Sequence, residues 1–202
     1  MELTAVQEDA LIELLNIGFG RAGASLSELT GQRVSLEIPK VTVHPLDDLE
    51  RGLAIVGADN VASVHQIFSG PVAGDALLIM DFGGAGRLKE LLTDEPALPL
   101  SLDASAREVL TEVGNILLNA CLGTFGNLLD VPVSFAVPHL NLDTLQKVVE
   151  SLVVNNQGLR FALVVQAAFR LRHAEITGYI VIVLSVGSLD RLIRGIEHWE
   201  SE

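Results

Sequence analysis

The chain has 202 residues, of which 49% are hydrophobic, and its 13 basic and 26 acidic residues give a formal net charge of −13. This length is sufficient to bury a sizeable core, either as one large domain or as two small ones. The acidic balance excludes nucleic acid as an expected partner, because binding to a phosphate backbone requires clusters of lysine and arginine. A membrane surface is excluded for the same reason.

The single cysteine, Cys121, cannot form an internal disulfide, and its apolar neighbours predict a buried side chain. The first residues, Met-Glu-Leu-Thr, contain neither a basic segment nor an apolar one, so no secretory signal is expected. The apolar runs 161–165 and 179–186 are too short to cross a bilayer and are rich in β-branched residues. We therefore expect a cytoplasmic protein without a transmembrane helix.

The first predicted element is a helix that starts after Thr4, which would cap it, and that runs past Asn16. Helical patterning continues from residue 18 to Gly31, which suits a C-cap. Residues 34–38 then alternate with period two and predict a strand that stops at Pro39.

The remaining elements of the first half are predicted in order as a loop or short helical turn over 47–52, strands over 61–68 and 75–82, and a short helix over 87–92. Residues 93–99, which are rich in proline and acid, are the best linker candidate. The second half predicts a helix from Asp103 to about Asp130, a strand over 133–137 that ends at Pro138, a helix over 143–151, a hairpin of strands 159–171 and 175–185, and a closing helix over 189–199.

A polar constellation occurs twice in this order of elements. Glu13, Asn16 and Pro39 recur 99 positions later as Glu112, Asn115 and Pro138. The repeat predicts one domain, 1–202, made of two homologous halves at about 1–95 and 100–202. We expect an α/β fold in which the halves pack about a pseudo-twofold axis and the helices cover one continuous β-sheet. The two motif helices should lie exposed on the same face.

Each motif helix carries its polar residues along one face, because positions i, i+4 and i+7 align on a helix. The two stripes are Asp9, Glu13 and Asn16 in the first half, and Glu108, Glu112 and Asn115 in the second. A carboxylate can pair with a cation, while a carboxamide can both donate and accept, as positioning a hydrolytic water requires. With no neighbouring nucleophile, the predicted chemistry is to position water or a partner's cation.

The doubled pattern Asp/Ser-x3-Glu-x2-Asn-x22-Pro resembles the signature of the CheC/CheX/FliY phosphatases of bacterial and archaeal chemotaxis. The resemblance covers nearly the whole chain. Within that family the length and the duplication are most similar to CheC, since FliY-type proteins carry an added flagellar-switch domain and CheX-type chains are shorter, with a single intact motif.

This resemblance implies a phosphatase that hydrolyses the aspartyl phosphate of a response-regulator receiver such as CheY in two-component signalling. It implies that Asn16 and Asn115 each orient the attacking water, while Glu13 and Glu112 each pair with the receiver's active-site lysine. The Mg²⁺ belongs to the receiver, so no cofactor or metal of this chain's own is expected.

Other residues support the motif or have a simpler explanation. Asp9 and Glu108 occupy the first motif position, and this difference leaves the relative activity of the two sites open. Pro39 and Pro138 are interpreted as structural residues that end strands. The glycines Gly18, Gly20 and Gly23 lack the context of a phosphate-binding loop, so close helix packing is the preferred explanation. The histidines His44, His65, His139, His173 and His198 are scattered without metal-ligand spacing.

A competing hypothesis from another class uses the same helices without efficient hydrolysis. The chain would then be a non-catalytic or weakly catalytic binding module that regulates a receiver or a CheD-type deamidase. A monomer is expected in either case, because the duplication already supplies the second half that a dimer would contribute.

Overall fold

The computed structural model describes residues 3–53, 60–94, 103–155, 158 and 160–199. The elements are α1 (Ala5–Thr30), β1 (Val34–Pro45), the 3-10 helix η1 (Leu46–Asp48), α2 (Leu49–Gly52), β2 (Val61–Ser69), β3 (Gly74–Asp81), α3 (Phe82–Thr93), α4 (Ala104–Leu128), β4 (Ser134–Phe135), β5 (His139–Asp143), α5 (Leu145–Asn155), β6 (Phe161–Leu171), β7 (Ala174–Leu184) and α6 (Val186–Trp199).

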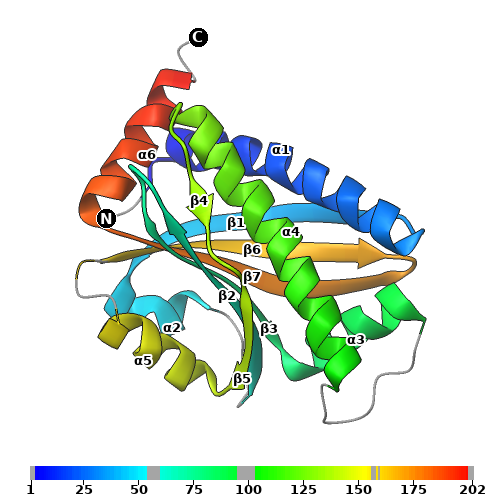
Figure 1. Cartoon of the computed structure of the whole chain (residues 1–202). Coiled ribbons are helices and arrows are strands. Elements are labelled where there is room, and N and C mark those ends of the chain that lie inside the picture. The colour runs from blue at the N-terminus through cyan, green and yellow to red at the C-terminus, as the bar shows by residue number, and fades with distance from the viewer. Residues whose placement is uncertain (1–2, 54–59, 95–102, 156–157, 159, 200–202) are drawn as a thin grey trace.

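The strands of the described residues form one seven-stranded sheet in which every pairing is antiparallel (Figure 1). The order is β1-β6-β7-β3-β2, and β4 and β5 both pair with the outer side of β2. Each long hairpin therefore receives its outer strand from the other part of the chain, and β3 pairs with β7 at the centre. The predicted continuous sheet is confirmed.

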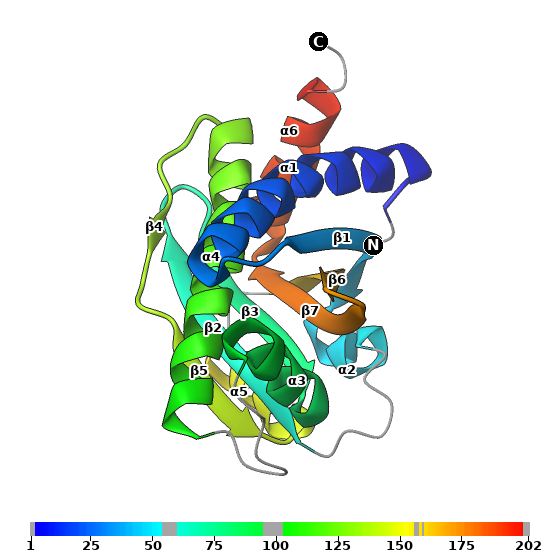
Figure 2. The same cartoon turned by 90° about the vertical axis from the view of Figure 1, so that its right-hand side faces the viewer.

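Helices cover both faces of this sheet. The long helices α1 and α4 contact each other and cross on one face, where α3 and α6 also pack (Figure 2). The short helix α2 and the amphipathic helix α5 lie on the opposite face, over a separate core cluster. The predicted α/β architecture, with helices packed on the sheet, is confirmed, and both motif helices lie on the same face.

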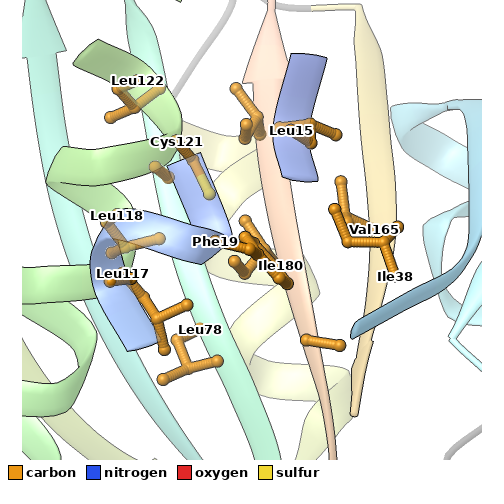
Figure 3. Close-up of a cluster of buried hydrophobic side chains, with 14 of the residues drawn as sticks. Leu15, Phe19, Ile38, Leu78, Leu117, Leu118, Cys121, Leu122, Val165 and Ile180 are labelled. Carbon is orange, nitrogen blue, oxygen red and sulfur yellow. The ribbon is translucent and has the colours of Figure 1, made fainter. Parts of the chain in front are cut away.

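The larger core lies between the crossed helices and the sheet (Figure 3). It includes Leu15 and Phe19 of α1, Leu117, Leu118, Cys121 and Leu122 of α4, and the sheet residues Ile38, Leu78, Val165 and Ile180. Each such side chain contributes about 1.5–3 kcal/mol when it is fully removed from water. This burial holds the inner faces of α1 and α4 in place and leaves their outer faces to carry polar groups.

Glycines set how closely these helices approach their neighbours. A Cβ at Gly18 would lie 2.9 Å from the Ala120 carbonyl oxygen, so α1 and α4 cross there in near backbone contact. A Cβ at Gly114 would lie 2.5 Å from Cγ1 of Val64, which places α4 close over β2. The close-packing explanation therefore holds for Gly18 but not for Gly20, around which a Cβ would meet nothing within 4 Å.

The predicted ends of the first helix are confirmed. The Gln7 N–H donates to Thr4 Oγ1 at 3.2 Å, and the Thr4 N–H donates to Gln7 Oε1 at 3.0 Å, which completes a capping box. Gly31 follows in the left-handed conformation, with a φ of 66°. The two predicted helical stretches form a single helix of 26 residues.

The prediction that Pro39 ends a strand is wrong. β1 continues through it to Pro45, and the pairing with β6 shifts register between Glu37 and Lys40. A proline is tolerated there because β1 is an edge strand and the register shift removes the need for its missing N–H. Pro138 lies between β4 and β5, so the predicted strand over 133–137 is reduced to two residues.

The starts of two further helices need correction. The helix expected over 87–92 begins at Phe82, because the Asp81 side chain accepts from the Gly84 N–H at 2.8 Å and caps it. The helix expected over 143–151 begins at Leu145, because Asp143 pairs with Val61 as the end of β5.

Within the described residues, α4 contains a window that is long and apolar enough, by length and composition alone, to cross a membrane. Of that window, 56% is buried inside the protein, as expected of a core helix. The proposed linker lies outside the described residues from position 95 onwards.

Candidate functional site

The first polar stripe lies on the outer face of α1. Leu11, Leu14 and Leu15 are buried against the sheet and α4, and this burial fixes the rotation of the helix. Glu13 and Asn16 are exposed one turn apart, and Asp9 is exposed one turn before Glu13. Among the described residues, no hydrogen bond or ion pair engages these three side chains. The carboxylate and the carboxamide are both available to an approaching partner.

The second stripe lies on α4 in a similar position. Leu110, Val113 and Leu117 are buried, as are the glycines and small residues that lie against the sheet. Glu108 and Glu112 are exposed, whereas Asn115 is only partly exposed. Each motif precedes the crossing of its helix with the other, so the structure presents two separate Glu/Asn pairs and not one combined cluster. Pro39 lies in the edge strand β1 and Pro138 in the connection between β4 and β5, so neither lies on these helices.

The side chain of Asn115 differs from that of Asn16 because it belongs to a hydrogen-bonded series. Asn119 Nδ2 donates to Asn115 Oδ1 at 2.8 Å. Gln66 Nε2 of β2 donates to Asn119 Oδ1 at 3.1 Å and to the carbonyl oxygen of Ala136 at 2.9 Å. Gln66 was not among the residues predicted from the sequence. It could have been recognised as an amide on the strand face that also carries Ala62, Val64 and Phe68, all of which face the larger core.

Two grooves on this face of the sheet differ in character. The first lies between α1, α4 and α6, has a volume of about 340 Å³ and is lined by Ile17 and Arg21 of α1 and by His198 and Trp199 of α6, among others, but by neither Glu13 nor Asn16. The second has a volume of about 310 Å³ and is mainly apolar, with Leu26, Leu29 and Leu92 next to Glu108 and Glu112. Only the second groove therefore includes motif residues, and it surrounds their carboxylates with aliphatic groups.

A larger pocket of about 560 Å³ lies on the opposite face of the sheet, between β2, β3, β5 and α5. His65 Nε2 and Asp75 Oδ1 are 2.5 Å apart in its wall. Lys147 Nζ lies 2.9 Å from Asp143 Oδ1, and this hydrogen bond, followed by one from the Thr144 backbone, lowers the pKa of Asp143. Within the described residues, no group of three His, Cys, Asp or Glu side chains could hold a metal ion.

Cys121 is a buried free thiol on the inner face of α4. Burial raises the pKa of this thiol well above its ordinary value, so it stays protonated. A protonated thiol within the core cannot serve as a nucleophile for either Glu/Asn pair. The groups that each pair itself offers are a carboxylate and a carboxamide, which act by charge and hydrogen bonding.

Comparisons with known proteins show what the whole chain is similar to. No family model matches the chain. The chain is 26% identical over 193 residues to the CheY-P phosphatase CheC of Bacillus subtilis (strain 168), and the match covers 92% of this chain and 91% of that protein.

Solved structures share the fold over most of its length. FliY of Thermotoga maritima matches with a TM-score of 0.77 and 16% identity, over 98% of this chain and 99% of that one. FliM from an H. pylori FliG–FliM complex matches with a TM-score of 0.66 and 10% identity, over 95% and 100% of the two chains. A chain from the complex of CheX with CheY, BeF3 and Mg²⁺ from Borrelia burgdorferi matches with a TM-score of 0.50 and 18% identity, over 83% and 96%. The predicted resemblance to the CheC/CheX/FliY family is confirmed.

Proposed function

Because the chain resembles the CheC/CheX/FliY family over nearly its whole length, we propose that it hydrolyses the aspartyl phosphate of a CheY-like response-regulator receiver. One observation carries the proposal. Two exposed helices on the same face of the sheet each present a glutamate and an asparagine one turn apart, and neither glutamate is engaged by another described residue. The name of the CheC relative and the CheX–CheY complex support a receiver as the partner.

In this proposal the phosphoryl group and its Mg²⁺ come with the receiver, and this chain supplies positioning. The carboxamide of Asn16 or Asn115 holds a water in line with the phosphorus. The water oxygen then forms a bond to phosphorus while the bond to the aspartyl oxygen breaks and releases the receiver's carboxylate. Phosphoryl transfer to water depends mostly on position and charge, so an oriented amide is sufficient for this role.

Glu13 and Glu112 would anchor the docked receiver through its active-site lysine. Both carboxylates are exposed before docking. An exposed ion pair contributes about 0–1 kcal/mol, but the same pair gains strength when the interface excludes water. The glutamate therefore stabilises the complex and the asparagine promotes the reaction. We expect loss of the glutamate to raise mainly KM and loss of the asparagine to lower mainly kcat.

The test is the decay rate of a phosphorylated receiver in the presence of wild type, Asn16→Ala, Asn115→Ala and the double variant. Each single variant should keep the activity of the other site. The double variant should lose the acceleration by roughly a hundredfold or more, the scale of lost positioning. Asn141→Ala, which changes an exposed asparagine on β5, is the matched control. Decay that the double variant accelerates as well as wild type does would refute the catalytic proposal.

A binding module is the second candidate, and the fold shared with FliM from a FliG–FliM complex favours keeping it. The same helices would then dock on a receiver, or the chain would regulate a CheD-type deamidase. Binding of the phosphorylated receiver without faster decay would support this alternative. Measurement of binding and decay on the same samples distinguishes the two functions.

A further inference from the structure

The carboxamide of Asn115 sits at the end of a series of hydrogen bonds that passes through the buried Gln66 of β2. The series runs from the Ala136 carbonyl through Gln66 and Asn119 to Asn115, with distances of 2.9, 3.1 and 2.8 Å. Gln66 is buried, with 2% of its surface exposed. Ala136 is itself held in place, because its N–H donates to the Ile67 carbonyl at 2.9 Å. The first member of the series is therefore fixed by the sheet.

The series has a single direction because its first member can only accept. The Ala136 carbonyl requires a donor, so the Nε2 end of Gln66 must face it. The same Nε2 meets Oδ1 of Asn119, which leaves Nδ2 of Asn119 to face Asn115. Asn115 must then turn its Oδ1 toward Asn119. Each amide in the series is oriented by the one before it.

The hydrogen bonding of Gln66 indicates that its donor atom, Nε2, is the end that the fold requires. Its Oε1 is the one buried side-chain polar atom among the described residues that has no hydrogen-bond partner. Leaving a buried acceptor unpaired is unfavourable, and buried polar groups are normally satisfied. The two hydrogen bonds that Nε2 donates offset the cost of leaving Oε1 unpaired.

We infer that Asn119, supported by Gln66, is a positioning residue of the second site, and this inference rests on the proposed function. By accepting from Asn119, Asn115 Oδ1 fixes the carboxamide and leaves the Nδ2 amino group, which no described residue engages, to donate to a docked aspartyl phosphate. One lone pair of Oδ1 remains for a hydrogen of the attacking water. The orientation that catalysis requires is then present before the receiver arrives.

The first site lacks such a series of hydrogen bonds. The position 99 residues before Asn119 is Gly20, which has no side chain to donate. Asn16 is exposed and makes no side-chain hydrogen bond to another described residue. Its carboxamide must be oriented during docking, so the second site should have the larger kcat when the receiver is saturating.

The experiment isolates the second site with Asn16→Ala and then compares Asn119→Ala and Asn119→Asp. Aspartate keeps the shape and can accept from Gln66, but it cannot donate to Asn115. Both variants should lower kcat about fivefold, the scale of one neutral hydrogen bond, with KM for the receiver nearly unchanged. In the protein that retains Asn16, Asn119→Ala should have no further effect once Asn115 is alanine, because only the first site then remains active.

A kcat that is unchanged, or a loss confined to KM or to the unfolding temperature, would overturn the inference. A second measurement does not depend on activity: the ¹⁵N order parameter of the Asn115 side chain should exceed that of Asn16 and fall in Asn119→Ala. If wild type fails to accelerate receiver decay, the proposed function fails, and the order parameters still decide whether Asn119 orients Asn115. Equal mobility of Asn16 and Asn115 would refute that orientation.

Discussion

The two Glu/Asn pairs use the same residue types on the same kind of helix, yet their surroundings differ. Asn16 is exposed, Gly20 one turn further has no side chain to hold it, and neither Asn16 nor Glu13 lines a described groove. Asn115 is partly buried and hydrogen-bonded to Asn119, and its groove is aliphatic with two carboxylates. The repeated motif specifies which groups are present. The neighbouring elements decide how firmly those groups are held and which charges a partner meets.

The oriented amide of Asn115 and the free amide of Asn16 each have a physical cost. An amide that is oriented in advance spares the docked complex the entropy of fixing it, but it accepts a narrower range of geometries. A free amide can adapt to more than one partner but must be ordered at each encounter. The chain therefore combines a rigid pair and an adaptable pair on one scaffold.

The largest expected effect comes from breaking the contact that both pairs share, the crossing of α1 and α4. Gly18→Val would drive a side chain into the Ala120 carbonyl and Thr124 Oγ1, both 2.9 Å from the Cβ position. We expect a loss of roughly 1–3 kcal/mol in the free energy of unfolding, with lower activity at both sites. Urea denaturation measures the loss. Gly20→Ala, in open space, is the control and should stabilise by about 0.5–1 kcal/mol.

Raising the salt concentration should increase KM by several-fold more at one site than at the other. Both sites carry two exposed carboxylates, Asp9 and Glu13 or Glu108 and Glu112, but the helix of the first site also carries Arg21, which offsets attraction for a cation. A receiver that presents a lysine should depend more on charge at the second site, since screening weakens exposed attraction. We expect KM of the Asn16→Ala protein to rise roughly threefold more than that of Asn115→Ala between low and high salt. Parallel salt curves would show that Arg21 does not contribute.

A smaller effect should come from Gly20→Asn, which gives the first site the residue that Asn119 supplies to the second. The open space around Gly20 accepts the side chain, and asparagine at i+4 can donate to Asn16. Without a counterpart of Gln66 the gain should be modest, about twofold in kcat in an Asn115→Ala background. A decrease in kcat would mean that Asn16 must remain free to turn.

The smallest effect is expected from Glu108→Asp, which makes the first motif position identical in both pairs. Glu108 is exposed and is engaged by no other described residue. We expect less than about a twofold change in second-site activity, as for most exposed substitutions. A larger change, measured as receiver decay in the Asn16→Ala protein, would assign the difference between the sites to Glu108 and not to Asn119.

Much of the fold could be predicted from the sequence because its signals are local. The capping box at Thr4, the glycine at position 31 and the alternation in β6 and β7 each reflect chemistry within a few residues. The exposure of Glu13 and Glu112 followed from helical periodicity in the same way. These predictions required no knowledge of how distant segments meet.

The remainder depended on contacts between distant segments. Pro39 continues β1 only because that strand lies at a sheet edge, which the sequence does not reveal. Gln66 reaches Asn119 across 53 positions of sequence, and the Ala136 carbonyl across 70. The pocket that contains His65 and Asp75 likewise forms only when β5 and α5 pack beside β2. Residues of this kind follow from topology, since no local pattern encodes them.

The motif prolines have a consequence for how copies of this protein behave toward one another. An edge strand with an unbroken row of N–H and C=O groups is a template for another chain, and proline interrupts such a row. Pro39 removes one N–H from β1, which continues through it, and Pro138 lies between β4 and β5, so neither margin of the sheet offers an unbroken row of donors. Together with the repulsion of a net charge of −13, these interruptions should keep concentrated protein from joining sheet to sheet into aggregates.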